Sequence, residues 1–231
     1  MKRFLPSLLL LMFSLSAALA TADDFSEGVE FYAEENYSAA ANAFRKSADK
    51  GNADAQFNLG LMYLNAQGVE QDFQQALSLF EQSAVQGNAR AQVNLARMYA
   101  KGKGVVANYG KALPWFKKAA DQGYADAQYS LGILYVTGTG TPRDYQKARA
   151  LFQQAADQNN ASAQYQLGLI YFKGKGVAVN LVEALKWMEL AGDYEDAVSY
   201  RKYAESKMSK DQIAEAKNLA SEWAANTPDK P

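Results

Sequence analysis

The stretch ADAQFNLGLMY at residues 53–63 decides the fold, because three further copies of it follow at intervals of 36 residues. ARAQVNLARMY begins at residue 89, ADAQYSLGILY at residue 125 and ASAQYQLGLIY at residue 161. A fixed spacing of this length is typical of a solenoid, in which each repeat buries its apolar face against its neighbours. The 231-residue chain is therefore expected to be a stack of repeats.

Each copy begins a pair of helices. Ala55, Leu59 and Met62 are spaced for one apolar face of the first helix. Gly60 lies in the middle of that helix, where glycine costs about 1 kcal/mol relative to alanine, so we expect a second helix to approach closely there. The second helices are predicted to start at four side chains that can accept a hydrogen bond from a free backbone N–H, namely Asp72, Asn108, Asp144 and Asn180. Pro114 falls inside one second helix, where it predicts a kink.

The turn between the two helices carries the sequence KGKGV at residues 101–105 and 173–177. Two glycines beside a lysine suggest a phosphate-binding loop, but the same place reads NAQGV at 65–69 and TGTGT at 137–141. The glycines recur more regularly than the lysines, and a phosphate-binding loop of the Walker type needs GxxxxGK[ST] after a strand. The pattern therefore predicts a turn whose glycines adopt positive φ.

The first twenty residues resemble a secretory signal peptide. Lys2 and Arg3 precede an apolar run over residues 4–15, and Ala18-Leu19-Ala20 is a small-x-small cleavage site, with Ala20-Thr21-Ala22 as a second option. No cysteine follows the run, so we expect a periplasmic or secreted protein without lipid anchor or membrane insertion. Cleavage after residue 20 would leave 22 Lys and Arg against 25 Asp and Glu, a net charge of −3. That balance argues against a nucleic-acid-binding protein.

Residue content limits the chemistry that the chain could perform. Cysteine and histidine are both missing from the sequence, which removes thiolate nucleophiles, Ser-His-Asp triads and the usual transition-metal ligands, so no metal or other cofactor is expected. Ser47 and Lys50 match the S-x-x-K pattern of β-lactam-binding enzymes, as do Ser199 and Lys202. Neither S-D-N nor K-T-G accompanies them. Ser47 is in register with Ser83, which favours a packing role.

The ends of the array depart from the 36-residue pattern, as capping repeats do. Ser209 and Gln212 form a predicted capping box for a last helix. The predicted organisation is a signal peptide at 1–20, an N-terminal repeat at 24–52, central repeats at 53–88, 89–124, 125–160 and 161–192, and C-terminal capping helices at 193–225.

The pattern A-x-A-Q-x-x-L-G-x-x-Y-x-x-G-x-G-V, followed by D-Y/F-x-x-A and A-A-D-Q-G, resembles Sel1-like repeats. The opening repeat, with Gly28, Tyr37 and Phe44, has the spacing of the related tetratricopeptide repeat. The resemblance implies an all-α fold, a right-handed α-solenoid of helix pairs, that acts as a protein-interaction scaffold rather than an enzyme. Exported relatives imply a protein or peptide partner in the cell envelope. Some relatives are associated with β-lactams, so a β-lactam-recognising or hydrolysing enzyme is the alternative.

In tetratricopeptide arrays the first helices line the concave face, and the resemblance carries this role to one stripe of each repeat. The stripe is more apolar than a solvated surface, so two interpretations stay open: it contacts a partner, or it packs between neighbouring first helices. The aromatic members are the predicted anchors and the arginines their polar complement. The candidate partner-binding residues are Phe57, Leu61, Arg90, Arg97, Tyr129, Ile133, Tyr165 and Phe172.

Overall fold

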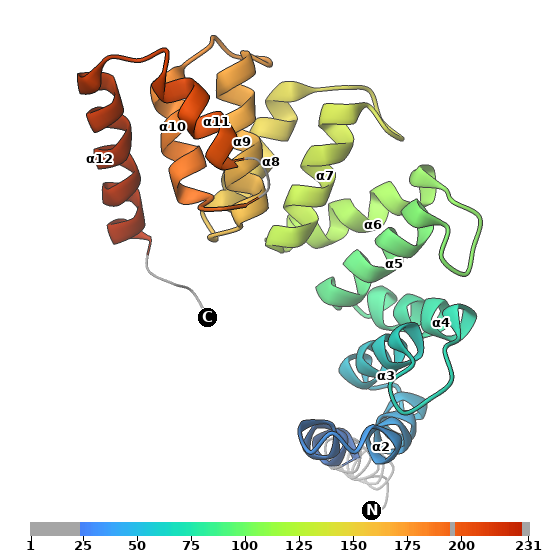
Figure 1. Ribbon diagram of the computed structural model, residues 1–231. Helices are drawn as coiled ribbons and strands as arrows, with labels where there is room; N and C mark the ends of the chain where they lie inside the picture. Colours follow the sequence, from blue (N-terminus) through green and yellow to red (C-terminus); the bar gives the residue numbers. More distant parts are fainter. Residues whose placement is uncertain (1–23, 195–196, 228–231) are drawn as a thin grey trace, which may run out of the picture. The chain divides into compact units, whose positions relative to one another are not determined.

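Figure 1 shows the computed structural model, which describes residues 24–194 and 197–227. These residues form twelve helices and no strand, which confirms the predicted all-α fold. The helices fall into two compact units, and the boundary between the units lies inside α6 (Tyr109–Asp121), after Ala112. The predicted signal peptide lies outside the described residues. None of the described helices is both long and apolar enough to cross a membrane.

The first unit stacks helix pairs of the predicted kind. Its elements are a helix over residues 24–33, called the N-terminal helix below, and α2 (Tyr37–Asp49), α3 (Ala53–Asn65), α4 (Phe73–Val85) and α5 (Ala89–Lys101). The N-terminal helix, α3 and α5 are the first helices of their repeats, and α2 and α4 are second helices. Phe44 of α2 and Leu59 and Met62 of α3 are at most 2% exposed and belong to one apolar core.

The second unit continues the same alternation and ends in two helices of the predicted C-terminal cap. After the end of α6 it contains α7 (Ala125–Thr137), α8 (Tyr145–Ala156), α9 (Ala161–Lys173), α10 (Leu181–Leu190), α11 (Ala197–Glu205) and α12 (Lys210–Asn226). Phe152, Leu167 and Trp187 are buried in its core. The ring of Trp187 in α10 meets the edge of Trp223 in α12, with 5.7 Å between ring centroids. This contact holds the last helix against the array.

The predicted helix caps form. Asp72 accepts hydrogen bonds from the backbone N–H groups of Gln74 and Gln75, and the other three predicted caps, Asn108, Asp144 and Asn180, accept similar bonds. Ser209 and Gln212 make the reciprocal capping box at the start of α12. Pro114 lies within α6 at an exposed position, so water can reach the carbonyl that loses its N–H donor. These side chains fix where each helix begins.

The mid-helix glycines allow first and second helices to touch, as predicted. A Cβ added to Gly60 would lie 2.8 Å from the ring of Phe80, and one added to Gly28 would lie 2.6 Å from the ring of Phe44. The second unit repeats this contact between Gly132 and the ring of Phe152 at 2.5 Å. The helix-propensity cost of each glycine is thus offset by close packing of a buried ring.

The KGKGV turns pack against the preceding repeat. Gly102 and Gly104 have φ of 69°, in the left-handed region, as predicted for a turn. A Cβ on Gly104 would lie 2.8 Å from both the Cβ and the carbonyl oxygen of Phe73, the first residue of α4. Lys103 places its ammonium 5.7 Å from the centroid of the Phe73 ring. The turn is therefore an inter-repeat contact.

A buried glutamine in each central repeat joins that repeat to the one before it. The four are Gln56, Gln92, Gln128 and Gln164, and each is at most 4% exposed. Each side-chain N–H donates to the carbonyl of an alanine eight residues earlier, at 3.1–3.5 Å. In the first unit, for example, Gln92 of α5 bonds the Ala84 carbonyl near the end of α4. The same carbonyl also accepts the backbone N–H of the turn that ends the helix, from Gly87 in this case, so the amide is its second donor and links the helix end to the next repeat.

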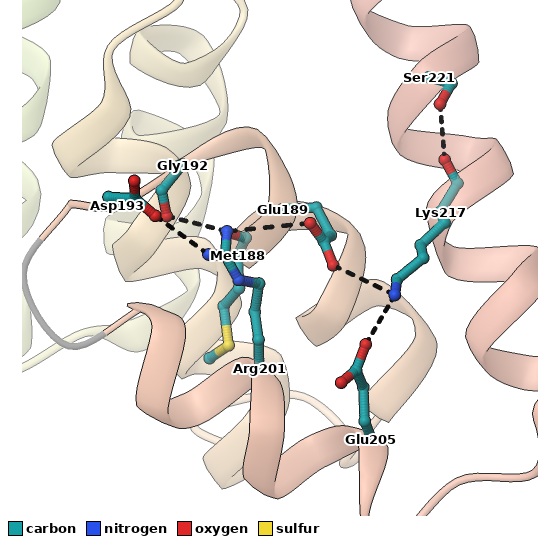
Figure 2. A network of polar contacts seen from close by, with 8 residues as sticks. All are labelled: Met188, Glu189, Gly192, Asp193, Arg201, Glu205, Lys217 and Ser221. Carbon is teal, nitrogen blue, oxygen red and sulfur yellow. Dashed lines mark hydrogen bonds and ion pairs between the residues drawn. The ribbon is translucent and has the colours of Figure 1, made fainter.

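Polar contacts fasten the C-terminal helices to α10 (Figure 2). Arg201 of α11 donates to the carbonyls of Met188 at 3.2 Å and Gly192 at 2.9 Å, and it pairs with Asp193 at 3.3 Å. Lys217 of α12 lies 2.8 Å from a Glu205 oxygen and 3.9 Å from a Glu189 oxygen. The hydrogen bond to Glu205 is the main cause that raises the pKa of Lys217.

Candidate functional site

The exposed side of the first helices in the first unit combines an apolar pocket with a row of cations. It is called the first-helix face below, and consists of Val29, Tyr32, Asn58, Leu61, Arg90, Arg97 and Lys101. Of the candidate partner-binding residues, Phe57, Leu61, Arg90 and Arg97 belong to this unit. Three of them, Phe57, Leu61 and Arg90, lie together at one pocket.

The pocket has a volume of about 430 Å³ and is mainly apolar. Its floor includes the rings of Phe44 and Phe57, which are 2% and 5% exposed. Val29 and Tyr32 of the N-terminal helix and Leu61 of α3 also line it. Val29 and Tyr32 are 45% and 39% exposed, so large apolar side chains are open to solvent at its mouth. Such an opening can accept an apolar side chain from another molecule.

Arg90 closes one side of this pocket and is held there by two contacts. Its guanidinium carbon lies 4.7 Å from the centroid of the Phe57 ring, a cation–π contact. One terminal nitrogen donates to a carboxylate oxygen of Asp54 at 2.9 Å. Asn88, the cap of α5, donates to the same oxygen. The side chain of Arg90 remains 49% exposed.

Arg90 continues into a polar stripe along α5. Arg90, Asn94, Arg97 and Lys101 are separated by four, three and four residues, which places them on one face of a helix. The residues between them, including Val93, Leu95 and Met98, are buried. The α5 stripe therefore points away from the core and carries three cations.

In the second unit, some of the candidate partner-binding residues are buried and others are only partly buried. Tyr129 and Ile133 of α7 are partly buried against the apolar core, and the Tyr129 ring lies 6.0 Å from that of Phe152. Tyr165 of α9 is only 4% exposed, because Tyr194 and Tyr200 cover it at centroid distances of 5.7 and 6.3 Å. A partner could reach Tyr165 only if these rings moved.

Phe172 lies at the other end of α9, within the same aromatic group. Its ring meets the edges of Tyr200 at 5.4 Å and Tyr203 at 5.6 Å. Tyr203 of α11 is 56% exposed, so the outer part of this group is open to solvent. Tyr165 and Phe172 thus come together around Tyr200, and their contact with a partner stays a prediction.

For part of the apolar stripe, the structure shows whether a residue packs between helices or is open to a partner. Three of the four residues at this equivalent position, Phe57, Val93 and Tyr165, are at most 5% exposed and pack inside the chain, whereas the fourth, Tyr129, is partly exposed. Leu61, Arg97 and Ile133, four residues further along their helices, are partly exposed. The outer members are therefore the ones available for contact.

Sequence reasoning missed Val29 and Tyr32. They follow Gly28 by one and four residues, just as Leu61 and Leu64 follow Gly60. Carrying the central register back to Gly28 would therefore have placed both side chains on the first-helix face. Tyr200 and Tyr203 were also missed, and α11 departs too far from the repeat pattern to offer such a register.

Other candidate chemistry finds no support in the described chain. Ser47 is completely buried, and the equivalent Ser83 donates to the Ala53 carbonyl at 2.7 Å, so both are packing residues as predicted. Among residues 24–194 and 197–227, no group of three or more acidic side chains could hold a metal ion.

Comparisons with known proteins agree with this architecture. Residues 53–88, 89–124, 125–160 and 161–193 match the Sel1 repeat, and residues 25–70 match a tetratricopeptide repeat. A comparison with curated proteins gives no match.

The similar solved structures include the following three chains. A Sel1 repeat protein from Oxalobacter formigenes is 37% identical with a TM-score of 0.66, covering 72% of this chain and 49% of that one. This chain thus spans about half the length of the Oxalobacter protein. The protective antigen c5321 of uropathogenic Escherichia coli is 25% identical with a TM-score of 0.48, covering 90% and 61%. The immunity protein Pa5087 from Pseudomonas aeruginosa is 19% identical with a TM-score of 0.50, covering 87% and 83%, and shows the fold alone.

Proposed function

Because this chain belongs to the Sel1 repeat family, whose fold generally serves as a protein–protein interaction scaffold, we propose that it is an adaptor for a partner protein or peptide. The partner binds to the exposed sides of the first helices. Each repeat contributes a few side chains to such a surface, as is usual for repeat proteins. The adaptor acts in the cell envelope or outside the cell, as the signal-peptide pattern of residues 1–20 predicts.

The pocket of the first unit is the observation that carries this proposal. Leu61, Val29 and Tyr32 leave apolar surface in a hollow of about 430 Å³, where a partner side chain would exclude water. Aromatic and arginine side chains are the residue types that contribute most to protein interfaces. Tyr32, Phe57 and Arg90 supply both types at this one place.

Site-specific crosslinking in intact cells tests the adaptor. A photo-crosslinking amino acid replaces Leu61 at the pocket, and in a second protein it replaces Val85, which is 75% exposed at the end of α4. We expect one envelope protein to be captured from position 61 and not from position 85, with mass spectrometry as the readout. Equal capture from both positions, or none from either, contradicts the proposal.

Two further measurements complete the test. N-terminal sequencing of protein recovered from the cell envelope should begin at residue 21 if export and cleavage occur as predicted. Nitrocefin turnover by the purified protein examines the alternative, a β-lactam-hydrolysing enzyme, which the buried position of Ser47 does not favour. Turnover that survives Ser47→Ala and disappears with Ser199→Ala would revive that alternative at the exposed serine of α11.

A further inference from the structure

We propose that a hollow between α9, α10 and α12 binds a primary carboxamide, the side chain of a glutamine or asparagine of another protein. The hollow belongs to the second unit, whereas the pocket that carries the adaptor proposal lies in the first, so the two sites can be tested separately. It is called the amide pocket below and is lined by Asn159, Ala161, Gln164, Leu190, Trp223, Ala224 and Thr227.

Gln164 presents an unused hydrogen-bond acceptor to this pocket. The residue is only 3% exposed, and its Nε2 donates to the Ala156 carbonyl at 3.5 Å. Its Oε1 accepts no hydrogen bond from any residue in 24–194 or 197–227. Leaving a nearly buried amide oxygen without a donor is unfavourable, so this atom favours a ligand that brings an N–H group.

Two equivalent glutamines show which group fits on this oxygen. In the first unit, Nε2 of Gln86 donates to Oε1 of Gln56 at 2.7 Å. In the second unit, Nε2 of Gln158 donates to Oε1 of Gln128 at 2.9 Å. Each donor lies 30 residues after its acceptor, just beyond the second helix of the same repeat. The fold itself therefore places a glutamine carboxamide on this oxygen twice.

The last repeat has no such glutamine. Thirty residues after Gln164 the chain has Tyr194, whose ring packs against Tyr165 with 5.7 Å between centroids. In addition, α10 ends at Leu190, two or three residues earlier in the repeat than α8 and α4 end. Among the described residues, the place that a carboxamide fills in the earlier repeats is thus left to the amide pocket.

Two further polar side chains complement the carbonyl oxygen of a carboxamide. Asn159 and Thr227 line the pocket, and neither side chain forms a hydrogen bond within the described part of the chain. Asn159, with φ of 61°, stands where the earlier repeats have Gly51, Gly87 and Gly123, all with positive φ. It keeps their backbone conformation and adds an amide donor. One acceptor and two donors match a group that carries both N–H and C=O.

The remaining walls suit the methylene groups of a glutamine or asparagine. The ring of Trp223 and the side chains of Leu190 and Ala224 are apolar, so they remove the methylene groups from water. The pocket has a volume of about 480 Å³, which leaves room for the side chain together with part of the neighbouring backbone.

The charges around the pocket favour a neutral ligand. None of the described residues that line it is charged. In the adjoining hollow Lys217 lies 3.9 Å from an oxygen of Glu189 (Figure 2), so these two charges offset each other. Asp157 and Glu222, both exposed, adjoin the lining in the sequence and disfavour a carboxylate. An ammonium group would lose water without gaining a carboxylate in the lining.

NMR titration of the isotope-labelled full chain, as recovered from cells, tests the amide pocket. The probe is N-acetylglutamine methylamide, and three matched compounds carry methionine, glutamate or lysine in place of glutamine. The readouts are the indole N–H of Trp223 and the side-chain amide of Gln164. We expect saturable shifts of both signals with the glutamine compound, half-complete at about 1–10 mM. The other three compounds should bind at least about fivefold more weakly.

Matched variants locate the binding. Ala224→Leu narrows the pocket and should weaken the glutamine compound at least about fivefold, whereas Ala225→Leu, the same change at the next exposed position of α12, should have no effect. Asn159→Gly keeps the backbone of the earlier repeats and should weaken binding about threefold. Gln164→Met should abolish the preference for the glutamine over the methionine compound, with circular dichroism confirming the fold.

The other outcomes overturn the inference in distinct ways. Equal binding of the glutamine and methionine compounds would show an apolar hollow only, and no shift with any compound would show a pocket that holds only water. Tighter binding of N-acetylglucosamine, which also carries an amide, overturns the choice of a protein side chain. Shifts that appear when the protein concentration is raised without a probe identify a second copy as the occupant.

Equal effects of Ala224→Leu and Ala225→Leu overturn the assignment to this pocket. Failure of the amide pocket leaves the adaptor function untouched, because crosslinking from position 61 tests that function in the other unit. Failure of the crosslinking likewise does not affect the titration.

Discussion

Gly104 lies directly against Phe73, so closely that a Cβ on the glycine would be 2.8 Å from the Phe73 carbonyl oxygen. Gly104 belongs to the KGKGV turn, and Phe73 begins the second helix of the preceding repeat. Gln74, the next residue of α4, also donates a hydrogen bond to the Gly104 carbonyl. The second glycine of the turn is therefore required both by its backbone conformation and by its neighbour.

Gly104→Ala should lower the free energy of unfolding by more than about 3 kcal/mol, because left-handed strain adds to a clash with backbone. The matched control is Gly87→Ala, where φ is 98° but a Cβ would meet no atom within 4 Å. That variant should lose only the conformational part, about 1–2 kcal/mol. Urea denaturation measures both, and equal losses would show that the contact with Phe73 is unimportant.

Gln92→Leu should destabilise the chain by about 0.5–1.5 kcal/mol, because the Ala84 carbonyl would lose one of its donors and keep the backbone N–H of Gly87. Gln71→Leu provides the control, since Gln71 also donates to a carbonyl, that of Leu64, at an exposed position. Water can replace that bond, so the change should stay within about 0.5 kcal/mol. Thermal and urea unfolding measure the stability of both variants. If Gln92→Leu left the stability unchanged, the glutamine would not be a stabilising contact between repeats.

Gly60→Ala should destabilise by about 1–2 kcal/mol despite the higher helix propensity of alanine, because the added methyl meets the buried Phe80 ring. Phe80→Leu should partly restore the double variant by vacating that space. In α6, Gly110→Ala meets only the Asn108 side-chain oxygen at 3.2 Å and should not destabilise. Chemical denaturation measures the stability of the original protein, of Gly60→Ala, of Gly60→Ala with Phe80→Leu, and of Gly110→Ala. A stabilising Gly60→Ala would mean that the helices separate easily.

Alkaline pH should weaken the fold through Tyr99. Its hydroxyl donates to Glu81 at 2.6 Å, and this bond, with burial, raises the pKa of Tyr99 from 10.0 to about 12. Between these values the unfolded chain loses the proton and the native chain keeps it, so stability falls as pH rises from about 10 to 12. Tyr99→Phe should make the loss of stability over that pH interval smaller. Identical slopes for the two proteins would contradict the raised pKa.

Arg201→Met should loosen α11 and α12 without unfolding the first unit. The change leaves the Met188 and Gly192 carbonyls without their charged donor, a loss of about 1.5–3 kcal/mol per bond. Hydrogen exchange should therefore accelerate in residues 197–226, while exchange in α3 stays unchanged. Lys217→Gln, at a more exposed ion pair, should have a smaller effect. Uniform acceleration along the chain would contradict a local role.

The sequence was sufficient for the parts of the fold that follow local rules. The cap at Asp72 and the positive φ of Gly102 depend on neighbouring residues and were predicted correctly. Gly60 correctly indicated a close second helix, because its propensity cost needs a reason. Gln92 was overlooked, because periodicity treats a glutamine as a surface residue and cannot show that its amide reaches a helix end.

The candidate site was less predictable because it depends on which side chains neighbouring helices cover. Phe57 and Tyr165 occupy equivalent positions, yet Arg90 stacks on one and two tyrosines cover the other. The second arrangement depends on α11, whose sequence does not follow the repeat. Val29 and Tyr32 also line the pocket, and they lie in the N-terminal repeat, which departs from the 36-residue pattern.

Several contacts between repeats form only once the later repeat is present. Gln92 reaches back eight residues to Ala84, and Gly104 reaches back 31 residues to Phe73. In both cases the later segment completes the earlier one. A chain that emerges from its N-terminal end could therefore add one repeat after another, each packing on a repeat already folded. Trp223 of α12 would then pack against Trp187 of α10 after the preceding repeats have formed.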